Sequence, residues 1–164
     1  MLDRMRETLF NILQGRIEGK IFADLFAGTG AVGIEALSRG AQQVYLAESA
    51  PAAWRVIEEN LKDLGIGREA SIERGDVGRV LPTIEADVYF LGPPYAANEA
   101  YEKTLTALGE KKCDLVIAQH GRRRDLAECY GKLQRTRIVK MGSNALTFFE
   151  PEQAPDQADA EDES

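Results

Sequence analysis

The fold is decided by one stretch near the start of the chain, Asp24-Leu25-Phe26-Ala27-Gly28-Thr29-Gly30-Ala31-Val32-Gly33. Residues 20–25 form an apolar run that predicts a short buried strand, and the apolar spacing over 31–38 predicts a helix. The glycines between them allow a sharp turn and a close approach to the backbone, because glycine has no Cβ. The stretch therefore predicts a strand, a glycine-rich turn and a helix. Such a unit either binds a ligand or is simply a tight turn.

Strands and helices alternate along the rest of the sequence. Further strands are predicted over 43–48, 70–74, 87–91, 114–118, 133–141 and 144–150, and helices over 2–13, 52–64, 77–84, 99–109 and near 123–129. Each parallel connection needs a crossover, so the alternation requires a sheet with helices on both faces. The last two strands meet at Gly142-Ser143, a hairpin turn. We predict an α/β domain with a seven-stranded, mostly parallel sheet and a C-terminal antiparallel hairpin.

The composition is that of one globular domain. The chain has 164 residues, of which 44% are hydrophobic and 29% charged. No apolar run approaches the ~20 residues of a membrane span, and the first residues do not read as a signal peptide. Cys113 and Cys129 form no motif, and His120 is the single histidine. We therefore expect reduced thiols, no metal site, no membrane contact and a cytoplasmic monomer.

The negative charge is concentrated at the end of the sequence. The net charge is −7, but residues 151–164 hold six acidic residues and no basic one. Residues 1–150 are left with 21 acidic against 20 basic residues. The end segment has no large apolar residue, so it is expected to be a disordered acidic tail behind a domain over 1–150.

Basic residues gather between His120 and Lys140. This stretch holds seven basic residues against Asp125 and Glu128. Arg122, Arg123 and Arg124 stand side by side within it. They are candidates for contacts with nucleic-acid phosphates, although a solvated charged face is the alternative.

Acidic residues lie at or just after the ends of three of the predicted strands, where open α/β sheets bind their ligands. The spacing Gly28-x-Gly30-x-x-Gly33 matches a dinucleotide fingerprint, but Asp24 beside it would repel a pyrophosphate. It would attract the ammonium and sulfonium groups of S-adenosylmethionine. Glu48 is placed to accept hydrogen bonds from ribose hydroxyls, unless it is an ordinary surface acid. Asp76 is placed for an adenine amino group or for capping the next helix.

The fourth predicted strand runs into Leu91-Gly92-Pro93-Pro94-Tyr95. Two successive prolines fix φ and remove two backbone donors, so the turn is rigid. Tyr95 then offers a flat ring on which an extruded base would stack. The alternative is a loop with a core tyrosine.

These motifs resemble those of S-adenosylmethionine-dependent class I methyltransferases that act on base amino groups. More narrowly, the sequence is similar to the bacterial 16S ribosomal RNA (guanine-N2) methyltransferase family. The resemblance lies in Asp3 to Leu13 (DRMRETLFNIL), Phe22 to Ala36 (FADLFAGTGAVGIEA), Glu48, Asp76, Pro93-Pro94-Tyr95 and Lys140 to Phe149 (KMGSNALTFF). It covers residues 3–150 and implies a Rossmann-like fold.

The resemblance also implies roles for single residues. The cofactor S-adenosylmethionine would be held by Asp24, Phe26, Gly28, Thr29, Gly30, Glu48, Asp76 and Val77. Gly92, Pro93, Pro94 and Tyr95 would form the catalytic turn that presents the base. Arg122, Arg123 and Arg124 would contact phosphates of small-subunit ribosomal RNA.

Two departures from the family pattern leave alternatives open. The family carries Asp or Asn where this chain has Gly92, and it has a basic stretch before the first helix, where this sequence starts at Met1-Leu2. We therefore expect weaker RNA affinity than in the family. A cofactor-binding pseudoenzyme is the first alternative to an enzyme. A nicotinamide-dependent oxidoreductase is the second, although Asp24 and the Pro-Pro-Tyr turn oppose it.

Overall fold

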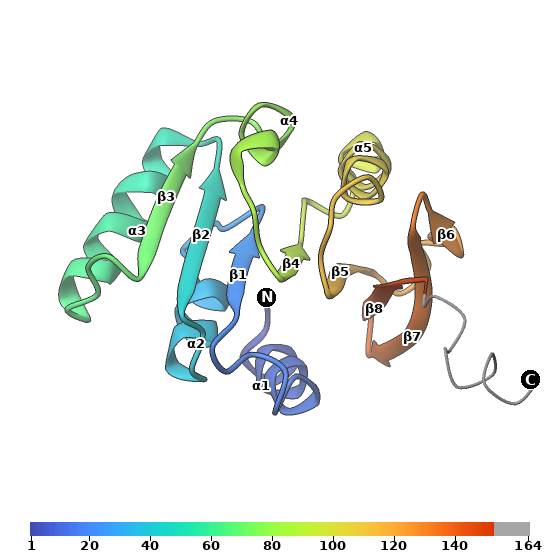
Figure 1. Cartoon of the computed structure of the whole chain (residues 1–164), viewed down its shortest axis with the longest axis horizontal. Coiled ribbons are helices and arrows are strands. Elements are labelled where there is room, and N and C mark those ends of the chain that lie inside the picture. The colour runs from blue at the N-terminus through green and yellow to red at the C-terminus, as the bar shows by residue number, and fades with distance from the viewer. Residues whose placement is uncertain (153–164) are drawn as a thin grey trace, which may run out of the picture.

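The computed structural model describes residues 1–152, which form a three-layer α/β domain (Figure 1). Its helices are α1 (Asp3–Ile12), α2 (Ala31–Ser38), α3 (Pro51–Asp63), α4 (Val77–Val80), the 3₁₀ turn η1 (Leu81–Thr83) and α5 (Asn98–Leu108). Its strands are β1 (Ile21–Asp24), β2 (Gln43–Glu48), β3 (Ala70–Arg74), β4 (Val88–Leu91), β5 (Leu115–Gly121), β6 (Cys129–Tyr130), β7 (Leu133–Met141) and β8 (Asn144–Pro151). No helix within this part of the chain is long and apolar enough to cross a bilayer.

The strands form one mixed sheet in the order β3-β2-β1-β4-β5-β8-β7-β6. β1 to β5 are parallel, and β8 lies antiparallel between β5 and β7. The order reverses between β1 and β4, because β1 pairs with β2 on one side and with β4 on the other. The mostly parallel sheet and the antiparallel C-terminal hairpin are thus as predicted. Ligands bind such sheets beyond the carboxyl ends of the strands near this reversal.

Helices cover both faces, because side chains of buried strands point alternately to opposite sides. Phe22 packs with α1, α2 and α3, whereas its neighbour Ala23 packs with α4, η1 and α5. β4 alternates in the same way, with Phe90 on the first face and Tyr89 on the second. Figure 1 shows α1 and α2 below the sheet and α4 and α5 above it.

The segment after β5 differs from the prediction. No helix forms near 123–129, and Cys129–Tyr130 form an eighth strand paired with β7. The reason is a contact from a distant residue: the Arg135 side chain donates to the Leu126 carbonyl at 3.2 Å, and its backbone N–H donates to the Glu128 carbonyl at 2.7 Å. These carbonyls are held by β7 instead of by the next turn of a helix.

Two strand ends lie further along the chain than predicted. β5 continues through Gln119 and His120 to Gly121. β8 includes Pro151, and the Glu152 N–H donates to the Lys132 carbonyl at 2.8 Å. The first two residues assigned to the acidic tail therefore belong to the sheet region. The rest of that predicted tail, 153–164, lies outside the described residues.

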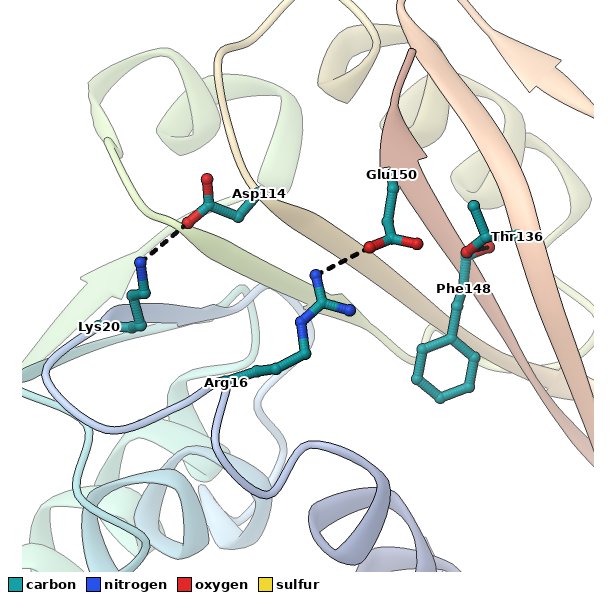
Figure 2. A network of polar contacts seen from close by, with 6 residues as sticks. All are labelled: Arg16, Lys20, Asp114, Thr136, Phe148 and Glu150. Atoms are coloured by element: carbon teal, nitrogen blue, oxygen red, sulfur yellow. Dashed lines mark hydrogen bonds and ion pairs between the residues drawn. The ribbon is translucent and has the colours of Figure 1, made fainter. Parts of the chain in front are cut away.

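Two ion pairs join the segment before β1 to the other half of the sheet (Figure 2). Lys20 lies 3.3 Å from the Asp114 carboxylate, just before β5, and Arg16 lies 2.9 Å from that of Glu150 on β8. All four side chains are at least one-third exposed, so each pair contributes at most about 1 kcal/mol. They lie at the amino ends of the parallel strands, away from the site described next.

Candidate active site

Two cavities of about 710 and 540 Å³ lie at the carboxyl ends of the parallel strands. They share the wall formed by Met1, Phe26, Gly28, Gly92 and Gln119, and so adjoin each other. The smaller one is further lined mainly by the glycine turn and Asp24. The larger one is further lined by Glu48, the Pro-Pro-Tyr turn and Asn144. One compartment therefore faces the predicted cofactor loop, and the other faces the predicted base-presenting turn.

The glycine turn has the backbone that its sequence requires. Gly28 and Gly30 have φ values of 58° and 84°, in the left-handed region that glycine adopts without strain. The Gly28 N–H donates to Glu48 Oε2 at 2.9 Å, and the Ala50 N–H donates to Oε1 at 3.2 Å. Asn60 Nδ2 donates to the Thr29 carbonyl at 3.0 Å. β2 and α3 thus fix the turn, and the Glu48 carboxylate lies beside it.

Asp24 is the buried acid of the site. Its side chain is only 1% exposed, and among residues 1–152 its Oδ1 has no hydrogen-bond partner. Burial, and to a smaller extent the nearby Glu48 carboxylate, raise the pKa of Asp24 to about 7 against opposing backbone hydrogen bonds. A cation or N–H donor in the smaller cavity would satisfy Oδ1 and favour the ionised form.

The Pro-Pro-Tyr turn is held from three sides. The buried Tyr101 hydroxyl donates its one hydrogen to the Gln119 carbonyl at 2.7 Å and lies 3.3 Å from the Pro93 carbonyl. Arg124 lies 4.3 Å above the Tyr101 ring and donates to the Tyr95 carbonyl at 2.7 Å. Tyr95 itself is 41% exposed, and its hydroxyl donates to Asn144 Oδ1. The ring therefore stands at the cavity mouth with its far end tethered.

Asp76 and Val77 do not line either cavity. Asp76 is exposed at the start of α4, and Val77 is buried in the core. The Gly75 N–H donates to the Glu48 carbonyl at 3.1 Å, which keeps this turn beside the end of β2. The Asp76 side chain makes no capping hydrogen bond, so the capping alternative is not seen.

The three consecutive arginines have different surroundings. Arg122 and Arg123 are exposed, and Arg122 donates to the Gly142 carbonyl at 3.1 Å. Arg124 is half-buried, because it holds the Pro-Pro-Tyr turn. All three line a separate cavity of about 190 Å³ together with His120, Arg135 and Lys140. Burial lowers the pKa of His120, so this histidine adds no charge to the basic cavity.

Among the residues that line the site, the sequence analysis missed Gln119 and Asn144. Gln119 lies in β5 and lines both cavities, and Asn144 begins β8 beside it. The register pairs Gly121 with Asn144, which brings the end of β5 and the start of β8 together. A signal for Gln119 was present, since it is the first polar residue after the apolar run Leu115–Ala118.

The family model described as conserved hypothetical protein 95 matches residues 1–150. The chain belongs to this family. Together with the relatives named below, this membership confirms the predicted resemblance to class I S-adenosylmethionine-dependent methyltransferases.

Relatives and a solved structure agree with the family. The chain is 30% identical over 156 residues to YlbH of Bacillus subtilis, whose name marks it as a candidate rRNA methyltransferase, and the match covers 90% of this chain and 84% of YlbH. It is 33% identical over 112 residues to ribosomal RNA small subunit methyltransferase D of Buchnera aphidicola, covering 67% of this chain and 58% of that protein. The structure of the Escherichia coli protein yhhF, titled a candidate methyltransferase, superposes with a TM-score of 0.83 at 28% identity, covering 93% of this chain and 88% of that one.

Proposed function

We propose that the protein transfers a methyl group from S-adenosylmethionine to the N2 amino group of a guanine in small-subunit ribosomal RNA. The observation that carries the proposal is the shared wall between the two cavities at Gly92 and Gln119. At this wall, the methyl group of a cofactor held against the glycine turn would meet a base held by the Pro-Pro-Tyr turn. The name of YlbH supports ribosomal RNA as the substrate, and the name of methyltransferase D supports the small subunit.

The residues around the glycine turn, with Asp24 in the smaller cavity and Glu48 in the larger one, suit the cofactor. Bound there, S-adenosylmethionine would supply an electrophilic methyl group. Asp24 would pair with its ammonium group, and Glu48 would accept hydrogen bonds from its ribose hydroxyls. Phe26 would pack on the cofactor, and Gly28 would leave room for it because glycine has no side chain.

The residues of the larger cavity suit an extruded base. Tyr95 would stack on the purine ring, and Pro93 and Pro94 would keep the backbone of the turn rigid. Most of the rate enhancement would come from holding the amine in line with the methyl group. Arg122 and Arg123 would contact RNA phosphates, whereas Arg124 would act mainly through the turn that it holds.

S-Adenosylhomocysteine at 1 mM is expected to raise the melting temperature, because a ligand that binds only the native state stabilises it by RT ln(1 + [L]/Kd). Methyl transfer is then measured with radiolabelled S-adenosylmethionine and small ribosomal subunits that lack the modification. Binding together with transfer to a guanine N2 supports the proposal. Binding without transfer to RNA supports the pseudoenzyme, and no thermal shift rejects the cofactor assignment.

Glu48→Ala is expected to raise the Kd for S-adenosylhomocysteine about 5- to 150-fold, which corresponds to roughly 1–3 kcal/mol. The ribose hydroxyls lose their acceptor, and the Gly28 N–H loses the bond that fixes the turn. Calorimetric titration measures the effect, with Glu69→Gln as a control at an exposed carboxylate far from the cavities. An unchanged Kd in Glu48→Ala would make Glu48 an ordinary surface acid.

A further inference from the structure

Gly92 directly follows β4 on the wall shared by the two cavities, and the side chain of Gln119 occupies the space beside it. A Cβ built on Gly92 would lie 3.1 Å from Gln119 Oε1 and 3.4 Å from the Phe90 ring. The φ of Gly92 is outside the left-handed region, so its backbone does not require glycine. What the glycine provides is room for the Gln119 side chain, which reaches across from β5, the neighbour of β4 in the sheet (Figure 1).

The orientation of the Gln119 amide follows from its hydrogen bonds. The Tyr95 hydroxyl has one hydrogen, which it donates to Asn144 Oδ1. The Gln119 group facing Tyr95 must then be the donor, and Nε2 lies 3.2 Å from the hydroxyl oxygen. Oε1 therefore points to Gly92, and among residues 1–152 no hydrogen bond reaches it. Gln119 is 9% exposed, so this oxygen is held in one place.

Methyl transfer to an aromatic amine needs an acceptor beside the nitrogen. As the N–C bond forms, the C–S bond breaks, its electron pair stays on sulfur, and a proton leaves the nitrogen for water. An oxygen that holds the N–H aims the lone pair at the methyl group and stabilises the positive charge that develops on the nitrogen. Gly92, Pro93 and Pro94 have no side-chain oxygen, so a side-chain acceptor must come from another strand.

The geometry points to Gln119 as a catalytic residue: its Oε1 is the side-chain acceptor for the target amino group, supplied from β5 in place of the residue that β4 lacks. The inference rests on the proposed function and deepens it. It also explains how a chain with glycine at position 92 is an active enzyme. Gln119 Oε1 occupies the space that a side chain at position 92 would take. Tyr95 then has two tasks, to stack on the base and to orient the amide.

The test moves the acceptor from one strand to the other. Gln119→Ala is expected to lower kcat about 100-fold while the Kd for S-adenosylhomocysteine changes less than threefold. Gly92→Asn alone is expected to be no more active than the native chain, because its Cβ crowds Gln119 Oε1. The double variant Gly92→Asn/Gln119→Ala removes that crowding and places an oxygen just after β4. Its kcat is therefore expected to be at least tenfold higher than that of Gln119→Ala.

Gln134→Ala on the exposed surface of β7 serves as the control, with native kcat expected. Each variant is assayed with small ribosomal subunits lacking the modification, and its melting temperature is recorded. Gln119→Met, which has similar volume without an oxygen, replaces Gln119→Ala if that variant does not fold. A native chain that binds S-adenosylhomocysteine but methylates no RNA overturns the proposed function and this inference with it. If the native chain is active, either of two results overturns the inference alone. One is a kcat of Gln119→Ala within threefold of the native value, and the other is a double variant whose kcat is no higher than that of Gln119→Ala.

Discussion

Asp24→Asn is expected to stabilise the protein, and to do so more at pH 8 than at pH 5. The carboxyl of Asp24 has an ordinary pKa of 3.8, which the native state raises to about 7. The native state thus binds this proton more tightly than the unfolded state. The stability that this bound proton contributes is fully present below pH 3.8 and is lost as the pH rises through about 7. The buried charge then costs on the order of 4 kcal/mol.

Urea denaturation between pH 5 and pH 8 measures this effect. The difference in unfolding free energy between Asp24→Asn and the native chain should grow up to about pH 7 and then level off, because asparagine does not titrate. Asp63→Asn, at an exposed acid on α3, is the control and should show no such growth. A pH-independent difference for Asp24→Asn would contradict a raised pKa in the native state.

The same substitution is expected to weaken the binding of S-adenosylmethionine at pH 8 by about tenfold or more. A cation beside Asp24 favours the ionised carboxylate, so binding to the native chain should release a proton and tighten from pH 6 to pH 8. Calorimetry in buffers of different ionisation enthalpy measures the proton release. A variant that is more stable and binds less tightly would show that Asp24 is kept for binding at a cost in stability.

Local sequence was enough to predict the part of the site built from one strand and the turn after it. The turn from Asp24 to Gly30 needs left-handed glycines at fixed positions, and those requirements act within a few residues. The same holds for the rigid turn that begins at Gly92. The strands at the centre of the sheet were predictable as well, because both their faces are buried and their apolar runs have no interruption.

Residues placed by pairing between distant strands were not predictable in this way. Gln119 enters the site because β5 continues past its apolar run, and Asn144 because β8 turns back beside it. The predicted helix near 123–129 was wrong for a related reason, since Arg135 from β7 takes its carbonyls. A residue's own neighbours in sequence do not reveal which strand will lie beside it.

Gly33→Ala is expected to destabilise the protein by about 1–3 kcal/mol, because α2 crosses β2 closely at this residue. A Cβ on Gly33 would lie 2.3 Å from Leu46 Cδ2 and 2.8 Å from Val44 Cγ1. Both side chains are fully buried, so they cannot withdraw without disturbing the core. Alanine favours helices, so a loss of stability here can come only from packing.

The added methyl group should also weaken cofactor binding, because α2 begins at the glycine turn and any shift of the helix moves Gly30 and Thr29 with it. Gly67→Ala is the matched control: its Cβ would meet only Glu69 Oε2, at 4.0 Å, and its φ is outside the left-handed region. Urea denaturation and titration with S-adenosylhomocysteine are compared for the two variants. Equal stability in both would mean that α2 has room to move away from β2. A destabilised Gly33→Ala with native affinity would mean that the turn, fixed by Glu48 and Asn60, keeps its shape independently of the helix that follows it.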